Sequence, residues 1–255
     1  NGNWNPIGWY QNTAQLSGNV SNSFKGTFDG DGHTISDLKI VNISKNLQNV
    51  GLFGVLDGAV VKNLVIEDAR VYGYNHVGIL AGQIKGESVI TDVTVEGTAA
   101  ANTSSGGYAS DAAVGGLAGK IFGSSSGSRA TIENVTATVN TVNLGAISKT
   151  GGIAGEVSNA YIVDTSVSAT GNNILGRYYV GGIVGAMSSG TSLYNVSVDG
   201  TIGGNGAYAV GGITGYYEGG EIVVARMFGE IGKTNAGTAR EGIFIGTRKD
   251  SVDMK

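Results

Sequence analysis

A short pattern of apolar residues and glycines recurs along most of the chain. It occurs seven times, and its closing glycines are Gly54, Gly82, Gly119, Gly155, Gly185, Gly215 and Gly246. Two positions before each closing glycine stands a large apolar residue: Leu52, Leu80, Leu117, Ile153, Ile183, Ile213 and Phe244. Successive closing glycines are 28, 37, 36, 30, 30 and 31 residues apart. Such self-similarity at a nearly fixed period indicates a repeat architecture, in which each unit stacks on the next.

A second pattern lies between these segments. An Asn or Asp is flanked by apolar residues two positions before it and one and three positions after it. The polar residues are Asp37, Asn63, Asp92, Asn134, Asp164 and Asn195, and Ala225-Arg226 stands in place of the Asn-Val pair in the last repeat. A continuous strand places every second residue on one face, so the alternation slips by one residue at the Asn or Asp. This slip requires a bend, and Asn and Asp tolerate the left-handed backbone of such a bend.

Each repeat therefore reads as three short strands joined by corners. Stacking such units predicts an all-β fold, a single-stranded parallel β-helix of about seven to eight coils of ~30 residues. Leu80, Leu117, Ile153, Ile183 and Ile213 should form one interior column. The six Asn and Asp side chains should line one corner, bonded to nearby backbone N–H groups. A propeller blade needs four strands, for which ~30 residues leave little room, and nothing resembles the helical segment of a leucine-rich repeat.

The ends and two of the coils depart from the repeat. We expect residues 1–34 to form an N-terminal cap and the start of the first coil, 35–246 the β-helix, and 247–255 a tail or linker. Two insertions rich in Gly, Ser and Ala, Ala99 to Ala113 and Phe122 to Arg129, bracket the same coil. Loops on a rigid scaffold often carry function, although flexible filler is the simpler interpretation.

Composition excludes several classes of protein. Charged residues are 14% of the chain, the net charge is −4, and no basic stripe is present, which argues against a nucleic-acid partner. No apolar run approaches the ~20 residues that span a bilayer, so no membrane span is expected in this chain. The absence of Cys excludes disulfides and thiolate metal sites.

The repeats resemble a known family. The segment WNPIG near the start, FKGTFDGDGHTISDLKI at 24–40, and the units NVGLFG and VGGIVG are similar to GLUG-motif repeat proteins of bacterial surfaces. That family includes the N-terminal, non-catalytic region of immunoglobulin-A protease-like zinc metallopeptidases. The resemblance spans roughly residues 4 to 246. It implies a secreted or cell-wall-anchored bacterial parent protein, with any catalytic domain elsewhere in that parent, and it implies no catalytic residue here.

The chain offers little catalytic chemistry. A zinc peptidase needs His-Glu-x-x-His, and neither His33 nor His76 is followed by Glu. We expect His33 at a tight turn and His76 at a surface corner. Among the carboxylates, Asp29 and Asp31 form a close pair that turn formation between glycines explains. We therefore expect no catalytic residue, no metal site and no cofactor; the alternative is a polysaccharide-acting β-helix enzyme, which clustered carboxylates in a groove would favour.

Tyrosines recur just before the same corner of the repeat. They are Tyr74, Tyr178, Tyr179 and Tyr208, with Tyr108 in the first insertion. Equivalent positions in stacked coils lie ~4.8 Å apart, so these rings could form a stripe suited to a host glycan or host protein. The simpler interpretation is that they only cover the edge of the coil. The sequence favours a non-catalytic module of a larger extracellular protein, acting as a spacer, an adhesive surface or a substrate-positioning domain beside other domains of its parent.

Overall fold

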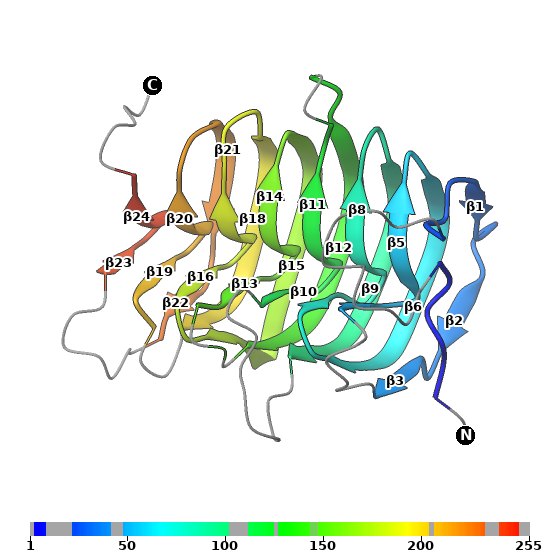
Figure 1. Cartoon of the computed structure of the whole chain (residues 1–255). Coiled ribbons are helices and arrows are strands. Elements are labelled where there is room, and N and C mark those ends of the chain that lie inside the picture. The colour runs from blue at the N-terminus through cyan, green and yellow to red at the C-terminus, as the bar shows by residue number, and fades with distance from the viewer. Residues whose placement is uncertain are drawn as a thin grey trace.

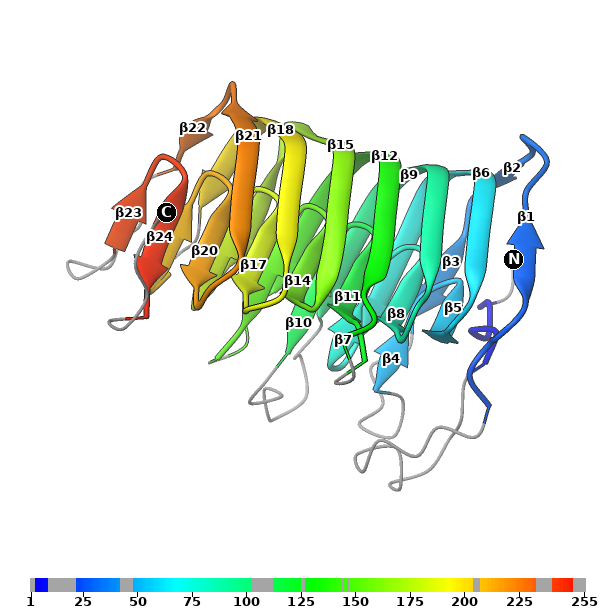
Figure 2. The same ribbon diagram turned by 90° about the horizontal axis from the view of Figure 1, so that it is seen from above.

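Each repeat of the sequence forms one turn of a parallel β-helix in the computed structural model (Figure 1). The structure describes residues 3–8, 22–41, 48–101, 112–124, 127–143, 145, 147–203, 207–232 and 240–249. Within these residues every strand pairing is parallel and there is no helix; about six turns of ~31 residues stack along one axis, as the colour gradient in Figure 2 shows. The predicted all-β parallel β-helix is thus confirmed, with about six turns in place of the seven to eight coils predicted. No described segment forms a helix that is both long and apolar enough to cross a bilayer.

Three sheets, one for each side of the coil, run along the axis. The short sheet contains β4 (Asn49–Val50), β7 (His76–Val77), β10 (Ala113–Gly115), β13 (Lys149–Gly151), β16 (Tyr179–Gly181), β19 (Ala209–Gly211) and β23 (Arg240–Gly242). The middle sheet contains β5 (Phe53–Asp57), β8 (Ala81–Lys85), β11 (Ala118–Phe122), β14 (Ala154–Ser158), β17 (Val184–Met187), β20 (Thr214–Tyr217) and β24 (Ile245–Arg248).

The long sheet contains the remaining strands and turns a corner within each of its longer members. Its strands are β1 (Thr27–Asp29), β2 (Thr34–Ser36), β3 (Lys39–Val41), β6 (Val60–Gly73), β9 (Val89–Ala101), β12 (Ala130–Asn143), β15 (Ala160–Gly176), β18 (Ser192–Gly203), β21 (Glu221–Met227) and β22 (Glu230–Ile231). Because β1, β2 and β3 all pair with β6, the chain from Thr27 onward already follows the course of the coil.

The large apolar residue of each glycine motif fills the interior. Leu80, Leu117, Ile153, Ile183 and Ile213 are all fully buried. Their backbones are hydrogen-bonded from coil to coil: the N–H groups of Leu80, Leu117, Ile153 and Ile183 donate at 3.0–3.1 Å to the carbonyls of Leu117, Ile153, Ile183 and Ile213. This continuous column confirms the predicted interior stack, and its burial removes much of the apolar surface of each coil from water.

The Asn or Asp of the second motif forms a corner. The backbone φ angles of Asn63, Asp92, Asn134, Asp164 and Asn195 lie between 47° and 55°, in the left-handed region that the phase slip predicted. Their side chains bond to each other rather than to backbone N–H groups. The Asn134 Nδ2 donates to the Asp92 carboxylate at 2.5 Å, and the Asn195 Nδ2 donates to that of Asp164 at 2.6 Å. Alternation of Asp and Asn along the axis supplies each amide with an acceptor, so the corner is stabilised by side-chain pairs.

One predicted member of this corner, Asp37, is wrong. Asp37 has a φ of 56°, but its N–H donates to the carbonyl of Glu67, which places it beside Asp68 at the next bend of the long sheet. The place next to Asn63 is taken by Gly30, whose neighbour Asp29 accepts a hydrogen bond from the Asn63 amide at 3.0 Å. In the last repeat the left-handed residue is Val224 (φ 57°) and not Ala225, because Val196 pairs with Ala225.

The paired glycines mark the corner between the short and middle sheets. Gly182 illustrates the reason: a Cβ atom there would clash with the carbonyl oxygen of Gly212 in the next coil and with the side chain of Val198. Adjacent coils therefore approach each other at this corner more closely than any side chain allows, which explains why the motif keeps glycine there.

The two ends of the coil differ. At the N-terminal end Phe24 and Phe28 pack on Phe53, with ring centroids 5.1 and 5.5 Å away. At the C-terminal end the column residue Phe244 is 47% exposed and its neighbour Ile243 is 69% exposed. The described residues thus cover the first coil with aromatic side chains and leave apolar side chains of the last coil in contact with water.

Candidate ligand-binding surface

The outer face of the middle sheet carries two rows of side chains along the axis. They occupy the first and third positions after each closing glycine, while the intervening residues, such as Ile84, Ile121 and Val157, are buried. The first row is Val55, Gln83, Lys120, Glu156, Ala186, Tyr216 and Thr247. The second row is Asp57, Lys85, Phe122, Ser158, Ser188, Glu218 and Lys249. These positions do not face the interior column and differ from coil to coil, although Val55, Ala186 and Thr247 are themselves buried.

Four tyrosines form a compact group where the short and middle sheets adjoin; we call Tyr178, Tyr179, Tyr208 and Tyr216 the tyrosine cluster. Tyr178 stacks on Tyr208 with ring centroids 5.0 Å apart, and Tyr179 stacks on Tyr216 at 4.6 Å. Tyr179 also meets the edge of Tyr178 at 4.5 Å. All four side chains are half-buried. Stacked and edge-on rings at these distances form a stable aromatic surface whose hydroxyl groups can still reach a ligand.

Small neighbours and burial shape this cluster. Ala209 follows Tyr179 in the register of the short sheet, and Ala186 precedes Tyr216 in that of the middle sheet, so no large side chain separates the rings. Burial raises the pKa of the Tyr179 hydroxyl above its ordinary value, with further contributions from the neighbouring tyrosines. This hydroxyl therefore ionises even less readily than that of an ordinary tyrosine and remains a hydrogen-bond donor. The Arg240 guanidinium lies 5.4 Å from the Tyr208 ring centroid and adds a cation at one edge.

The structure brings together three of the five predicted tyrosines. Tyr178, Tyr179 and Tyr208 are in contact, as the coil register implies. Tyr74 precedes β7, and β10 and β13 lie between β7 and β16, so it stands about 14 Å along the axis from the cluster. Tyr108 and most of the first insertion lie outside the described residues. Tyr216 was missed because it belongs to another strand; its position one residue after a closing glycine was the available signal.

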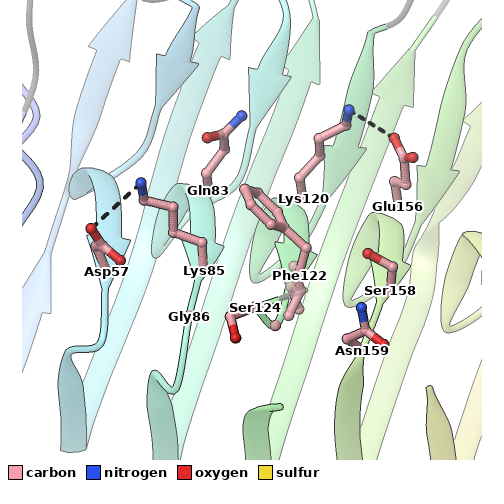
Figure 3. Close-up of a pocket in the computed structure, with 12 residues that line it drawn as sticks. Asp57, Gln83, Lys85, Gly86, Lys120, Phe122, Ser124, Glu156, Ser158 and Asn159 are labelled. Carbon is pink, nitrogen blue, oxygen red and sulfur yellow. Dashed lines mark ion pairs between the residues drawn. The ribbon is translucent and has the colours of Figure 1, made fainter. Parts of the chain in front are cut away.

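A polar groove lies farther along the middle sheet, over β8, β11 and β14 (Figure 3). It has a volume of 650 Å³, and side chains of four successive coils line it. The residues that line the groove are Asp57, Gln83, Lys85, Gly86, Lys120, Ile121, Phe122, Gly123, Ser124, Glu156, Ser158 and Asn159. Phe122, Gly123 and Ser124 belong to the second predicted insertion, so this insertion contributes to the groove.

Ion pairs hold the charged groups of the groove. Figure 3 shows Lys85 paired with Asp57 and Lys120 paired with Glu156, at 3.4 and 3.0 Å. Each carboxylate also contacts a second lysine outside the lining, Asp57 at 3.6 Å from Lys25 and Glu156 at 2.8 Å from Lys149. The carboxylates are thus shared, and the lysine ammonium groups outnumber them.

The two histidines have structural partners. The Nδ1 of His33 lies 3.1 Å from the carbonyl oxygen of Gly30 in an exposed turn, as expected for a turn residue. His76 is not at the surface as expected: it is 9% exposed, and its Nδ1 lies 2.8 Å from Asn49 Oδ1 and 3.0 Å from Gln83 Nε2. In the part of the chain that the structure describes, no three His, Cys, Asp or Glu side chains lie close enough together to hold a metal ion.

The comparisons with known proteins give two similar sequences. Over 228 residues, 84% of the chain, it is 25% identical to the immunoglobulin A1 protease of Streptococcus pneumoniae. Over 86 residues, 33% of the chain, it is 44% identical to halomucin of Haloquadratum walsbyi. The matched regions cover 11% and 1% of those proteins, so the chain spans only a small part of the length of either relative. No family model matches the chain. No solved structure matches it.

Proposed function

We propose that this chain is a non-catalytic β-helical module of a larger extracellular bacterial protein, and that it binds a glycan or protein through the tyrosine cluster. The observation that carries the proposal is the contact of Tyr178, Tyr179, Tyr208 and Tyr216 on one outer surface. Half-buried tyrosines on a rigid scaffold offer apolar area with little loss of side-chain freedom on binding, which is why tyrosine is frequent at recognition surfaces.

The extracellular setting rests on the similarity to an immunoglobulin A1 protease and on the GLUG-type repeats. Because the similar region is about a tenth of the protease, the module would accompany other domains, one of which would supply any catalysis. Within such a parent the rigid coil would hold the tyrosine cluster at a fixed distance from those domains, and thus position a bound partner for them. A repeat solenoid is well suited to this role because each turn adds a similar rise along the axis, so the number of turns sets the distance.

The geometry of the polar groove supports a non-catalytic role. Asp57 and Glu156 are the carboxylates of its lining, and β8 and β11 lie between their strands. Three strand spacings separate these strands by about 14 Å. Paired carboxylates of glycoside hydrolases lie about 5 to 9.5 Å apart, and in this groove both carboxylates are held by lysines. The alternative of a polysaccharide-acting enzyme thus finds no matching pair in the groove.

The test is a binding screen of the whole chain against a glycan array and a panel of host extracellular proteins. A Tyr178→Ala/Tyr208→Ala variant removes one stacked pair and should weaken binding about tenfold, since each ring contributes roughly 0.5–1.5 kcal/mol. The matched control is Tyr161→Ala/Tyr194→Ala, which removes two exposed tyrosines, 42% and 50% accessible, from the long sheet. This control should bind as the unaltered chain does.

Two results would contradict the proposal. Binding that survives the loss of Tyr178 and Tyr208 unchanged would place the site elsewhere on the coil. If the unaltered chain retains no glycan and no protein from the screen, the chain acts as a spacer and not as a binding module.

A further inference from the structure

The ion pairs in and beside the polar groove contain more lysines than carboxylates. Two carboxylates each contact two lysines, and the four contacts are Asp57 with Lys25 and Lys85, and Glu156 with Lys120 and Lys149. The lining itself is balanced, with two lysines and two carboxylates, but the two further lysines beside it give the ion-paired groups a surplus of two positive charges, whereas the whole chain has a net charge of −4. The excess remains when Glu87 is counted, which follows Gly86 in the adjacent turn and accepts a hydrogen bond from Ser128. The groove together with these flanking lysines is therefore more favourable to anions than the rest of this acidic protein.

Three of these four lysines are held in place, whereas the side chain of Lys25 is 67% exposed. The side chains of Lys85 and Lys120 are each 20% exposed, and that of Lys149 is 15% exposed. Their aliphatic parts are packed and their ammonium groups are fixed by the ion pairs, so little side-chain entropy remains to be lost when a ligand binds. Fixed cations beside shared carboxylates can donate further hydrogen bonds to an incoming anion.

An aromatic ring lies between these cations. Phe122 stands next to Lys85 on one side and Ser158 on the other in the register of the middle sheet, and Figure 3 shows its ring directed between Lys85 and Lys120. It is half-buried, so one part of the ring faces the groove. The C–H face of a pyranose packs on such a ring, while Gln83 and Asn159 offer amide groups to its hydroxyls.

The spacing of the coil suits a chain of sugars. Adjacent strands lie about 4.8 Å apart, which is comparable to the length of one pyranose unit, so a chain along the axis would place successive units over successive coils. Each of β8, β11 and β14 is paired with a strand on both sides, so a peptide has no strand edge here to extend. We propose that the polar groove binds an acidic oligosaccharide, with carboxylate or sulfate groups of the ligand at Lys85 and at Lys120, on either side of Phe122.

This site is separate from the tyrosine cluster, and its test can be made separate too. Isothermal titration calorimetry of the whole chain would use hexagalacturonate and a heparin hexasaccharide as the carboxylated and sulfated probes. Fully methyl-esterified hexagalacturonate serves as the neutral match, and a hexaglutamate peptide as the acidic non-sugar. At least one acidic saccharide should bind, more weakly as salt is raised, and both control ligands should bind at least tenfold more weakly.

Variants assign the binding to the groove. Lys85→Gln and Lys120→Gln each leave the partner carboxylate one lysine and should each weaken binding about tenfold, the effect of one charged hydrogen bond. Phe122→Ala should weaken binding as well. Two control variants should leave saccharide binding unchanged. One is Lys62→Gln, which removes an ion-paired lysine from the long sheet, and the other is Tyr178→Ala/Tyr208→Ala.

The outcomes separate the two proposals. The assignment of the groove would be overturned if neither acidic saccharide bound. It would also be overturned if the esterified probe or hexaglutamate bound as tightly as the acidic saccharides. Neither result would affect the proposal for the tyrosine cluster. If the tyrosine variant loses saccharide binding and the lysine variants retain it, the saccharide binds at the tyrosine cluster. Thermal unfolding of each variant confirms that the coil is intact.

Discussion

A single substitution at the left-handed residue of the last coil should raise the free energy of unfolding. Five coils place Asn or Asp at this corner, at Asn63, Asp92, Asn134, Asp164 and Asn195. The last one places Val224 there, with a φ of 57°. The left-handed region costs an L-residue roughly 1–2 kcal/mol, and a β-branched side chain adopts it least readily, whereas Asn tolerates it. Val224→Asn should therefore stabilise the coil.

The structure sets the size of the effect. Val224 is 46% exposed, so replacing it removes only part of an apolar contact, worth about 1 kcal/mol or less. The side chain of Asn195 lies in the preceding coil at the same corner, and its Oδ1 already accepts a hydrogen bond from Arg226 at 2.9 Å. Relief of the backbone strain is then the main gain, and we expect a net increase of about 0.5–1 kcal/mol in the free energy of unfolding.

Thermal unfolding and hydrogen exchange would measure this gain. A gain of 1 kcal/mol raises the Tm of a chain of this size by about 2–4 °C. Hydrogen exchange should slow most at the β21 amides, because the substitution stabilises the last coil. The matched control is Val223→Asn, the same change at the preceding residue, which is 44% exposed and lies outside the left-handed region. If both variants shift the Tm equally, the backbone argument is wrong.

Two further predictions concern the interior and the N-terminal corner. Ile183→Ala should lower the free energy of unfolding by about 2–5 kcal/mol in denaturant titrations, because the residue is fully buried, whereas Tyr194→Ala at a half-exposed position should change it by about 0.5 kcal/mol or less. The Asn63 amide, the Asp31 N–H and Lys62 lower the pKa of Asp29 from 3.8 to about 2. A depressed carboxyl pKa stabilises the fold above pH 3.8, and this stabilisation is lost as the pH falls toward 2. Asn63→Gly should therefore make the free energy of unfolding less steeply dependent on pH between 4 and 2. An unchanged slope of unfolding free energy against pH would refute this prediction.

The sequence was sufficient for the parts of the fold that repeat. Burial of Leu80 or Ile183 and the bend at Asn134 follow from constraints that every coil shares, and repetition makes these constraints visible without any homologue. The same reasoning failed where a coil departs from the rule. Asp37 has the right flanking residues but belongs to a second bend of the long sheet, and Val224 has no polar side chain to reveal its backbone conformation.

The candidate surfaces were only partly predictable, for a physical reason. The tyrosines before the short strands share a position in the repeat, so the register alone brings Tyr178 and Tyr208 together. The same argument placed Tyr74 with them, although two strands lie between β7 and β16, because a shared column says nothing about distance along the axis. The groove was missed altogether, since it combines side chains of four coils that have no motif in common.

This contrast indicates where function resides in a coil of this kind. The interior column and the glycine corner admit few residue types, so they are alike in every turn and specify only that the turns stack. The first outward position after each closing glycine is Val55, Gln83, Lys120, Glu156, Ala186, Tyr216 and Thr247 in successive coils, a series with no common chemistry. Because these positions do not face the interior column, variation among them changes the surface without changing the fold. The departures from the repeat, and not the repeat itself, therefore distinguish the tyrosine cluster from the polar groove.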